Sequence, residues 1–114
     1  MLQDWENDHV QNWDANDLLS KIATWQANDI SIGPYYKGDI KYALKSIRAR
    51  SILIPCTQDL YFPPEDNVIE AQHIPNVELR PYDSPLGHCV ANPGNDKNFA
   101  DILDININKL LNQF

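Results

Sequence analysis

Asp59 and His88 are the residues of this 114-residue chain whose types and positions suggest chemistry. A hydroxyl group holds its proton too tightly at neutral pH to be a good nucleophile, and a histidine within hydrogen-bond reach can accept that proton during attack. A carboxylate bonded to the other ring nitrogen fixes the tautomer of the histidine and stabilises the imidazolium that forms. An aspartate and a histidine held together therefore predict the orienting acid and the base of nucleophilic catalysis.

Each of these two residues follows a short apolar run that is typical of a β-strand. Residues 51–56 read Ser-Ile-Leu-Ile-Pro-Cys and precede Asp59, and residues 77–82 read Val-Glu-Leu-Arg-Pro-Tyr and precede His88. Two such runs, joined by a connection long enough for a helix, predict parallel strands of a βαβ unit. Since parallel strands end at the same edge of a sheet, we expect the Asp59 carboxylate to lie roughly 2.6–3.2 Å from a ring nitrogen of His88.

Three other acids near this edge compete with Asp59 for the orienting role: Glu65, Asp66 and Asp83. The first two follow a Pro-Pro pair and suit the first turn of a helix, where the helix dipole stabilises carboxylates. Asp83 follows the second strand, and we expect it to shape the loop before His88 by accepting hydrogen bonds from nearby backbone amides. The pattern therefore favours Asp59 as the acid.

His88 also has alternative interpretations. A Gly-His dipeptide on its own is more often a loop histidine that caps or packs. Here an aspartate at one strand end, a Pro-Pro helix start and a Gly-His pair after the next strand occur together in one order, which favours a catalytic histidine. Cys89 is a candidate nucleophile with His88 as its base, but neighbouring side chains of an extended loop point apart, which disfavours that arrangement.

The chain contains no motif that would supply a serine nucleophile. In the α/β-hydrolase fold the nucleophile lies on a Gly-x-Ser-x-Gly turn, and the acid and then the histidine follow it in the sequence. That motif is absent from all 114 residues, whose serines are Ser20, Ser31, Ser46, Ser51 and Ser84. Two parallel strands with their helices also cannot cover both faces of their own sheet. The sequence therefore predicts the C-terminal part of an α/β-hydrolase fold, completed by a missing N-terminal part or by a partner.

Apolar residues at helical spacing predict four helices. Asp14 or Asn16 caps the first, which runs to about Gln26 and is expected to bury an apolar face formed by Leu18, Leu19, Ile22, Ala23 and Trp25. Asp39 begins the second, and a Pro-Pro pair begins the third, which runs to about Gln72. The last helix is expected to lie across the sheet through one apolar stripe: Phe99, Ile102, Leu103, Ile107, Leu110, Leu111 and Phe114.

The first 17 residues are rich in acids and contain two tryptophans, Trp5 and Trp13. Carboxylates and His9 are potential metal ligands, but their spacing here matches no known ligand pattern. We therefore expect a solvated acidic face anchored by the two tryptophans, and no metal site.

Composition and charge exclude several classes of partner. The net charge is −7 and the Lys and Arg residues are scattered, which argues against nucleic acid. No apolar run reaches the roughly 18–20 residues of a membrane helix, and the first residues lack the features of a signal peptide. We therefore expect a cytoplasmic protein with no membrane partner. Its two cysteines are expected to be a buried strand residue, Cys56, and a free thiol, Cys89, with one disulfide between them as the alternative.

Three segments of the chain carry a family resemblance. They are Trp13-Asp14-Ala15-Asn16-Asp17-Leu18-Leu19 with Asn28-Asp29-Ile30, residues 47–54 with Asp59-Leu60-Tyr61-Phe62-Pro63-Pro64-Glu65, and Asp83-Ser84-Pro85-Leu86-Gly87-His88. They resemble the lid helix, the penultimate strand with its acid loop, and the histidine loop of α/β-hydrolase-fold acyltransferases typified by homoserine O-acetyltransferase. The resemblance implies a Ser-His-Asp triad that passes an acetyl group from acetyl-CoA to a hydroxyl, with Asp59 and His88 as its acid and base. Members that act on homoserine have an aspartate after the histidine, where this sequence has Cys89.

These observations predict two regions. Residues 1–48 are expected to form the end of a helical lid and a return helix, and residues 49–114 the C-terminal part of an α/β-hydrolase core. The parent protein would transfer an acyl group between a small-molecule donor and acceptor through a serine acyl-enzyme, with acetyl-CoA as a substrate and no bound cofactor. This chain, which carries only the acid and the histidine, is expected to be inactive alone. A serine esterase of the same family and a non-catalytic remnant that serves as an interaction module stay open as alternatives, and a homodimer partner is a further expectation.

Overall fold

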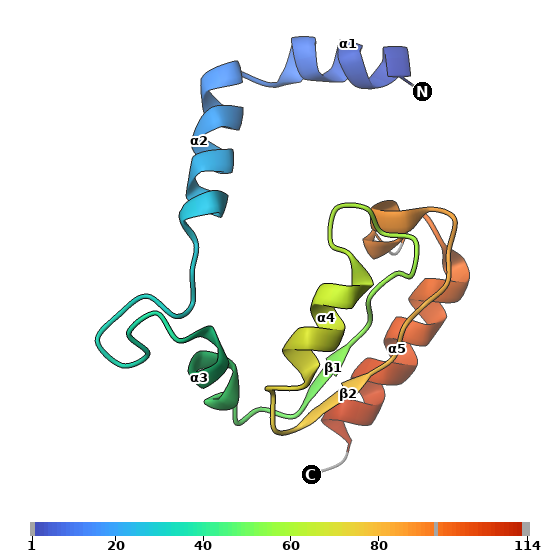
Figure 1. Cartoon of the computed structure of the whole chain (residues 1–114). Helices are drawn as coiled ribbons and strands as arrows, with labels where there is room; N and C mark the ends of the chain where they lie inside the picture. Colours follow the sequence, from blue (N-terminus) through green and yellow to red (C-terminus); the bar gives the residue numbers. More distant parts are fainter. Residues whose placement is uncertain (1, 93, 113–114) are drawn as a thin grey trace.

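The computed structural model describes residues 2–92 and 94–112. Within those ranges it has two parallel strands and five α-helices, so the chain is a mixed α/β structure. The strands β1 (Ser51–Leu53) and β2 (Val77–Leu79) pair with Ser51 opposite Val77 and Leu53 opposite Leu79. Helix α4 (Pro64–Ala71) connects them. The predicted parallel βαβ unit is thus confirmed (Figure 1).

Both strands are shorter than the predicted six-residue runs because proline interrupts their pairing. The nitrogen of Pro55 carries no hydrogen and cannot donate to the neighbouring strand. Pairing resumes beyond it, where the Tyr82 N–H donates to the Pro55 carbonyl at 2.9 Å and the Thr57 N–H donates to the Tyr82 carbonyl at 2.9 Å. A parallel bridge between Cys56 and Tyr82 belongs to the same extension. The two segments therefore stay side by side up to the loops that carry Asp59 and His88.

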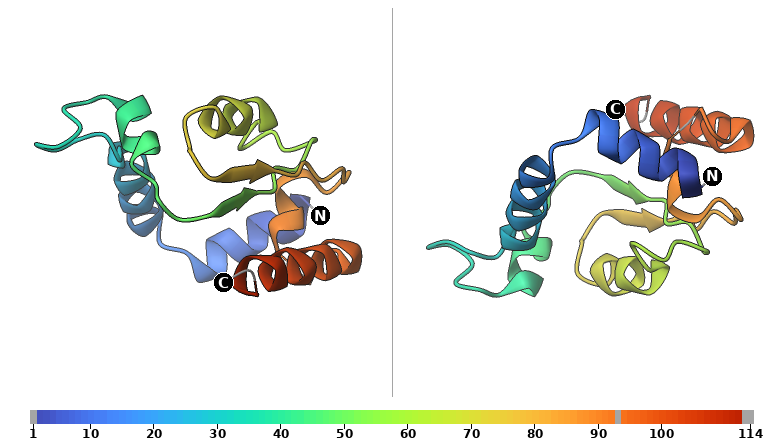
Figure 2. Two further views of the ribbon diagram at one scale, coloured as in Figure 1. Left: turned by 90° about the horizontal axis from the view of Figure 1, so that it is seen from below. Right: turned by 90° about the horizontal axis from the view of Figure 1, so that it is seen from above.

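The two faces of this small sheet are covered by different helices. Helix α4 lies on one face and α5 (Lys97–Leu111) on the other (Figure 2). The core beneath α5 contains the buried residues Cys56, Val90 and Phe99, with Ile54, Tyr82 and Leu103 packed against them. Asp96 caps α5 by accepting from the Phe99 N–H at 3.1 Å, and it also accepts from the Tyr82 hydroxyl at 3.0 Å. The start of α5 is thereby tied to the end of β2, and α5 lies across the sheet as predicted.

The predicted apolar stripe of α5 is only partly buried. Phe99 is buried, but Ile107 and Leu111 are exposed, and Phe114 lies outside the described residues. The buried position in the middle of the helix is instead Asn106, which accepts from Arg80 and donates to the Ile102 carbonyl at 2.7 Å. A two-stranded sheet is too narrow to cover the full stripe, and Arg80, the residue directly after β2, has a polar partner on the helix.

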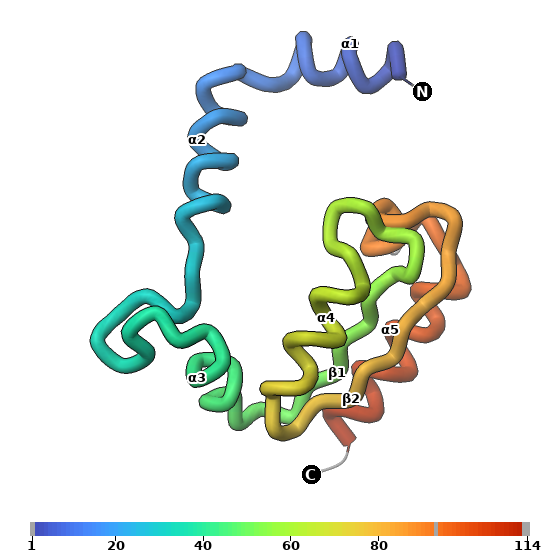
Figure 3. Tube along the Cα trace, viewed as in Figure 1, coloured from blue at the N-terminus to red at the C-terminus, as the bar shows by residue number. Residues whose placement is uncertain are grey.

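The N-terminal helices extend away from the two-stranded body. Helices α1 (Leu2–Asn12), α2 (Ala15–Ala27) and α3 (Ile40–Lys45) follow one another along a single path that Figure 3 traces. Asp14 caps α2 and Asp39 caps α3, as predicted. The radius of gyration is 17.2 Å, whereas a compact chain of this length would have about 13 Å. The boundary proposed between residues 48 and 49 stays a prediction.

Two expectations about the N-terminal helices are wrong. Neither α1 nor α2 contains a buried residue, and Leu19, Ile22 and Trp25 of the predicted buried face are exposed. Trp5 and Trp13 are exposed as well and do not anchor the acidic segment. Helical spacing indicates that a face is apolar, but it does not show which element covers that face. None of the described helices is both long enough and apolar enough to cross a membrane.

Candidate active site

The Asp59 carboxylate is held by the backbone of its own loop. One oxygen, Oδ1, accepts from the N–H groups of Tyr61 at 2.8 Å and Phe62 at 3.0 Å. The other oxygen, Oδ2, lies 3.0 Å from Nδ1 of His88. The predicted distance between the two side chains is therefore confirmed, whereas their catalytic roles stay a prediction.

Asp59 is ionised at neutral pH. Its side chain is only 9% exposed, and this desolvation would raise its pKa. Hydrogen bonds from the Phe62 N–H, the His88 ring and the Tyr61 N–H favour the charged form, and together they outweigh desolvation, so the pKa is lowered. An ionised carboxylate can only accept hydrogen bonds, so Nδ1 of His88 must carry the proton between them. In the neutral imidazole this leaves Nε2 as the acceptor.

His88 reaches Asp59 because of the glycine before it. His88 belongs to the 3₁₀ helix η1 (Gly87–Ala91), which begins at Gly87 with a φ of +52°. Glycine adopts this left-handed conformation without steric cost. A Cβ on Gly87 would also lie 2.8 Å from the carbonyl oxygen of Gln58, the residue before Asp59. The Gly-His pair singled out in the sequence thus allows close contact between the two loops.

Aromatic rings surround the imidazole of His88. The ring centroids of Tyr61 and Phe62 lie 5.1 Å and 5.0 Å from that of His88. The Phe62 ring in turn lies 5.5 Å from that of Trp25 on α2. Sequence reasoning missed this cluster because it assigned Trp25 to the apolar face of its helix. The available signal was the Leu-Tyr-Phe triplet that directly follows Asp59.

Of the three acids that competed with Asp59 for the orienting role, two lie as predicted and one does not. Glu65 and Asp66 occupy the first turn of α4, as predicted. The prediction for Asp83 is wrong: its Oδ1 accepts from the Thr57 hydroxyl and from Nε2 of Gln58 at 3.2 Å, which are side chains of the opposite loop. These two hydrogen bonds lower the pKa of Asp83, and the bond from Thr57 has the larger effect.

The cysteines are both free, as predicted. Cys56 is buried at the end of the β1 segment, where its thiol lies 3.4 Å from the Ser84 carbonyl oxygen, and Cys89 is exposed. Within the described residues no group of three or more His, Cys, Asp or Glu side chains is arranged to hold a metal ion.

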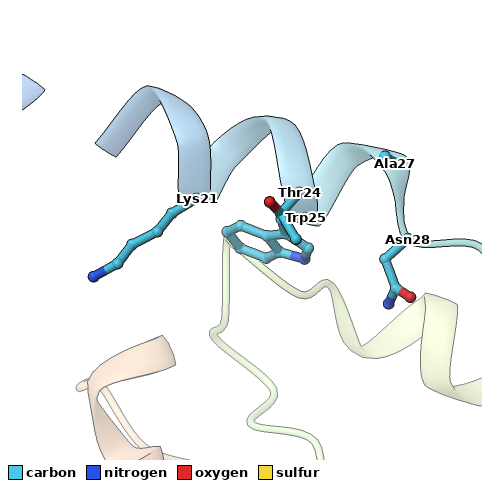
Figure 4. A pocket seen from close by; sticks show the side chains of 5 residues that line it. All are labelled: Lys21, Thr24, Trp25, Ala27 and Asn28. Carbon is cyan, nitrogen blue, oxygen red and sulfur yellow. The ribbon is translucent and has the colours of Figure 1, made fainter. Parts of the chain in front are cut away.

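The pair borders a small hollow at the carboxyl end of β1. This hollow has a volume of about 360 Å³, and its lining includes Asp59, His88, Phe62 and the buried core residue Phe99. A larger hollow of about 610 Å³ lies along α2 and is lined by Lys21, Thr24, Trp25, Ala27 and Asn28 (Figure 4). The lining of the larger hollow contains no histidine or carboxylate, whereas the lining of the smaller one contains both.

Comparisons with known proteins identify relatives that act on esters or acyl groups. The chain is 36% identical over 98 residues to an ethyl acetate hydrolase of Pseudomonas veronii, a match that covers 86% of this chain and 27% of that protein. It is 32% identical over 88 residues to a probable esterase of Corynebacterium glutamicum, covering 77% of this chain and 25% of that protein. It is 47% identical over 57 residues to a probable acyltransferase of Methanothermobacter thermautotrophicus, covering 49% of this chain and 18% of that protein.

No family model matches the chain, and no solved structure matches it. The chain spans about a quarter of the length of the first two relatives and less of the third. The names of the three relatives fit a part of an α/β-hydrolase family whose members hydrolyse esters or transfer acyl groups.

Proposed function

We propose that this chain is part of an α/β-hydrolase fold and supplies the acid and the base of a serine-type acyl-transfer site. Asp59 orients His88, and His88 acts on a serine hydroxyl contributed by sequence outside these 114 residues. The observation that carries the proposal is the 3.0 Å hydrogen bond between Nδ1 of His88 and Oδ2 of Asp59. It occurs at the shared carboxyl edge of β1 and β2, which is where this fold places its acid and its histidine.

The geometry supports a two-step mechanism. Nε2 of His88 takes the serine proton while the serine oxygen bonds to the carbonyl carbon of the ester, and the imidazolium then gives that proton to the departing alcohol. In the second step Nε2 takes a proton from water or an alcohol while the oxygen of that molecule bonds to the acyl carbon, and the imidazolium then returns the proton to the serine oxygen as its bond to the acyl group breaks. Asp59 stays ionised throughout and stabilises each imidazolium. The scheme requires neither a metal nor a bound cofactor, and its partners are a small-molecule acyl donor and acceptor.

Hydrolysis of a small ester is the reaction that the comparisons support best. The two relatives that match most of this chain are named as an ethyl acetate hydrolase and an esterase. Cys89 follows the histidine, and a thiol offers no carboxylate to pair with the ammonium group of homoserine. Acyl transfer from acetyl-CoA to a hydroxyl is the second candidate, and the 47% identity to a probable acyltransferase favours it.

A chimera tests the proposal directly. The matched segment of the Pseudomonas veronii ethyl acetate hydrolase is replaced by this chain, and hydrolysis of p-nitrophenyl acetate and ethyl acetate is measured. We expect turnover in the chimera, and a loss on the order of 10⁴-fold in kcat on Asp59→Asn, because the histidine then takes the wrong tautomer. His88→Gln should abolish turnover, whereas His73→Gln, which removes a histidine near the opposite end of β2, should leave it intact.

Three outcomes would contradict the proposal or separate its two candidate reactions. A folded, active chimera that is unaffected by His88→Gln would contradict the proposal. Release of free coenzyme A from acetyl-CoA that depends on an added alcohol, with the matching ester as product, would favour the transferase. The 114-residue chain alone should not hydrolyse p-nitrophenyl acetate, and turnover that is abolished by His88→Ala would place a nucleophile within the chain.

A further inference from the structure

Side chains connect the two active-site loops beyond the last backbone hydrogen bond. The backbone pairing of the strand segments ends where the Thr57 N–H donates to the Tyr82 carbonyl at 2.9 Å. One step further, Oδ1 of Asp83 accepts from the Thr57 hydroxyl and from Nε2 of Gln58. A single carboxylate oxygen on the histidine loop thus holds two consecutive residues of the acid loop.

Gln58 links this bridge to the Asp59–His88 pair. Its side chain donates to Asp83 at 3.2 Å, and its carbonyl oxygen lies against Gly87. The residue after Gln58 is Asp59, and the residue after Gly87 is His88. A displacement of Gln58 therefore changes the separation of Oδ2 of Asp59 and Nδ1 of His88.

We propose that Asp83 is a positioning residue that holds the two loops in register so that Asp59 meets His88. Asp83 itself bonds to neither residue of the pair. It acts through Thr57 and Gln58, and its charge strengthens both hydrogen bonds. That Asp83 serves catalysis rests on the proposed function. Its effect on the contact between Asp59 and His88 can be measured in the 114-residue chain by itself.

Two simpler explanations of Asp83 predict different results. If Asp83 acted only through its charge, its removal would favour the ionised form of Asp59 and lower the pKa of Asp59. If Asp83 only stabilised the fold, its removal would lower the melting temperature and leave the pair unchanged. If Asp83 positions the loops, its removal weakens the bond between His88 and Asp59, and the pKa of Asp59 rises.

The test is an NMR measurement on the isotopically labelled 114-residue chain. The ¹⁵N shifts of His88 report the fraction of imidazole that carries its proton on Nδ1, and the ¹³Cγ shift of Asp59 reports its pKa. For Asp83→Ala we expect the ratio of bonded to open forms of the pair to fall about fivefold, the effect of one typical hydrogen bond. Thr57→Val, which removes only the hydroxyl, should change both readouts in the same direction by less.

Conservative variants serve as matched controls. Asp83→Asn keeps an acceptor oxygen without the charge, and Thr57→Ser keeps the hydroxyl, so both should retain the Nδ1-protonated form of His88. Asp29→Ala removes the same charge and a comparable side-chain hydrogen bond, with Ser31, in the loop before α3, and should change neither readout. If Asp83→Ala fails to fold, the His88 shifts of Thr57→Val are compared with those of Thr57→Ser, and a difference between the two variants supports the positioning role.

The inference is overturned if Thr57→Val and Asp83→Ala leave the His88 shifts unchanged, or if Asp83→Ala lowers the pKa of Asp59. Its failure is distinguishable from failure of the proposed function. Changed shifts in these variants, together with an inactive chimera, would support the positioning role and contradict the acyl-transfer site. An active chimera with unchanged shifts would contradict only the positioning role.

Discussion

The carbonyl oxygen of Gln58 occupies space that a side chain on Gly87 would need. A Cβ at position 87 would lie 2.8 Å from that oxygen, closer than real Cβ atoms approach a backbone oxygen. Gly87 also has a φ of +52°. Two separate requirements, close approach and a left-handed backbone, thus select glycine immediately before the histidine.

Gly87→Ala should therefore lower the free energy of unfolding by about 1–3 kcal/mol, the cost of strain at such a position. It should also separate His88 from Asp59, because the contacting atom is backbone and cannot rotate away. Urea unfolding and the ¹⁵N shifts of His88 measure the two effects. Gly38→Ala is the matched control, since Gly38 has a φ of +84° but no atom within 4 Å of its Cβ position. Equal effects of the two substitutions on His88 would contradict the contact argument.

The contact between Asp59 and His88 could be predicted from the sequence because strand ends are encoded locally. Asp59 and His88 each follow an apolar run, and parallel strands bring their ends to one edge. The partners of Asp83 could not be predicted in this way. They lie 26 and 25 positions away in the sequence, and the direction of the Asp83 side chain depends on the geometry of both loops.

The N-terminal helices show a second limit of the sequence pattern. The apolar spacing of α2 predicted a helix, but not which element would cover its face. Helix α1 was not predicted because it lacks an apolar stripe. Local contacts accompany it instead, including a hydrogen bond at 2.8 Å between the His9 ring and the Trp5 carbonyl.

Glu78 should control the acid stability of the chain. Its carboxylate binds Lys109 on α5 at 2.9 Å, Arg80 directly after β2, and Arg50 before β1 at 3.0 Å. Hydrogen bonds from these three cations lower the pKa of Glu78 from 4.5 to about 2, and the bond from Lys109 has the largest effect. A lowered folded-state pKa contributes stability that is present above pH 4.5 and is lost as the pH falls towards 2.

Glu78→Gln should therefore flatten the loss of stability over this pH range. At pH 7 it should also destabilise the chain, because three cations remain with no carboxylate between them. Urea midpoints between pH 2 and pH 7 measure both effects, and added salt should reduce them because the groups are partly exposed. Glu70→Gln is the control, since the Glu70 carboxylate accepts from the Asn67 side chain. An unchanged pH profile in Glu78→Gln would contradict the assignment.

The two thiols should differ in their reactivity. Cys89 is exposed on η1, whereas Cys56 is 5% exposed and packs with Val90 and Phe99. A thiol reagent should label one cysteine at once and the second only as the core opens. Cys89→Ser should remove the fast phase alone. Labelling in denaturant without reductant should count two thiols, and a count of zero would mean a disulfide.

Helix α2 should detach from the body more readily when Trp25 is removed. The Trp25 ring lies 5.5 Å from Phe62, and α2 has no buried residue, so this aromatic pair is a large share of its attachment. An aromatic pair contributes about 0.5–1.5 kcal/mol, so Trp25→Ala should increase the population of the detached helix by about 2- to 13-fold. Cleavage within residues 15–27 by a dilute protease should accelerate by the same factor, since proteolysis follows the open population when opening is fast. Trp5→Ala is the matched control because the Trp5 ring contacts His9 within α1, 5.0 Å away. Equal cleavage rates in Trp25→Ala and the unsubstituted chain would show that contacts other than the one between Trp25 and Phe62 hold α2 to the body.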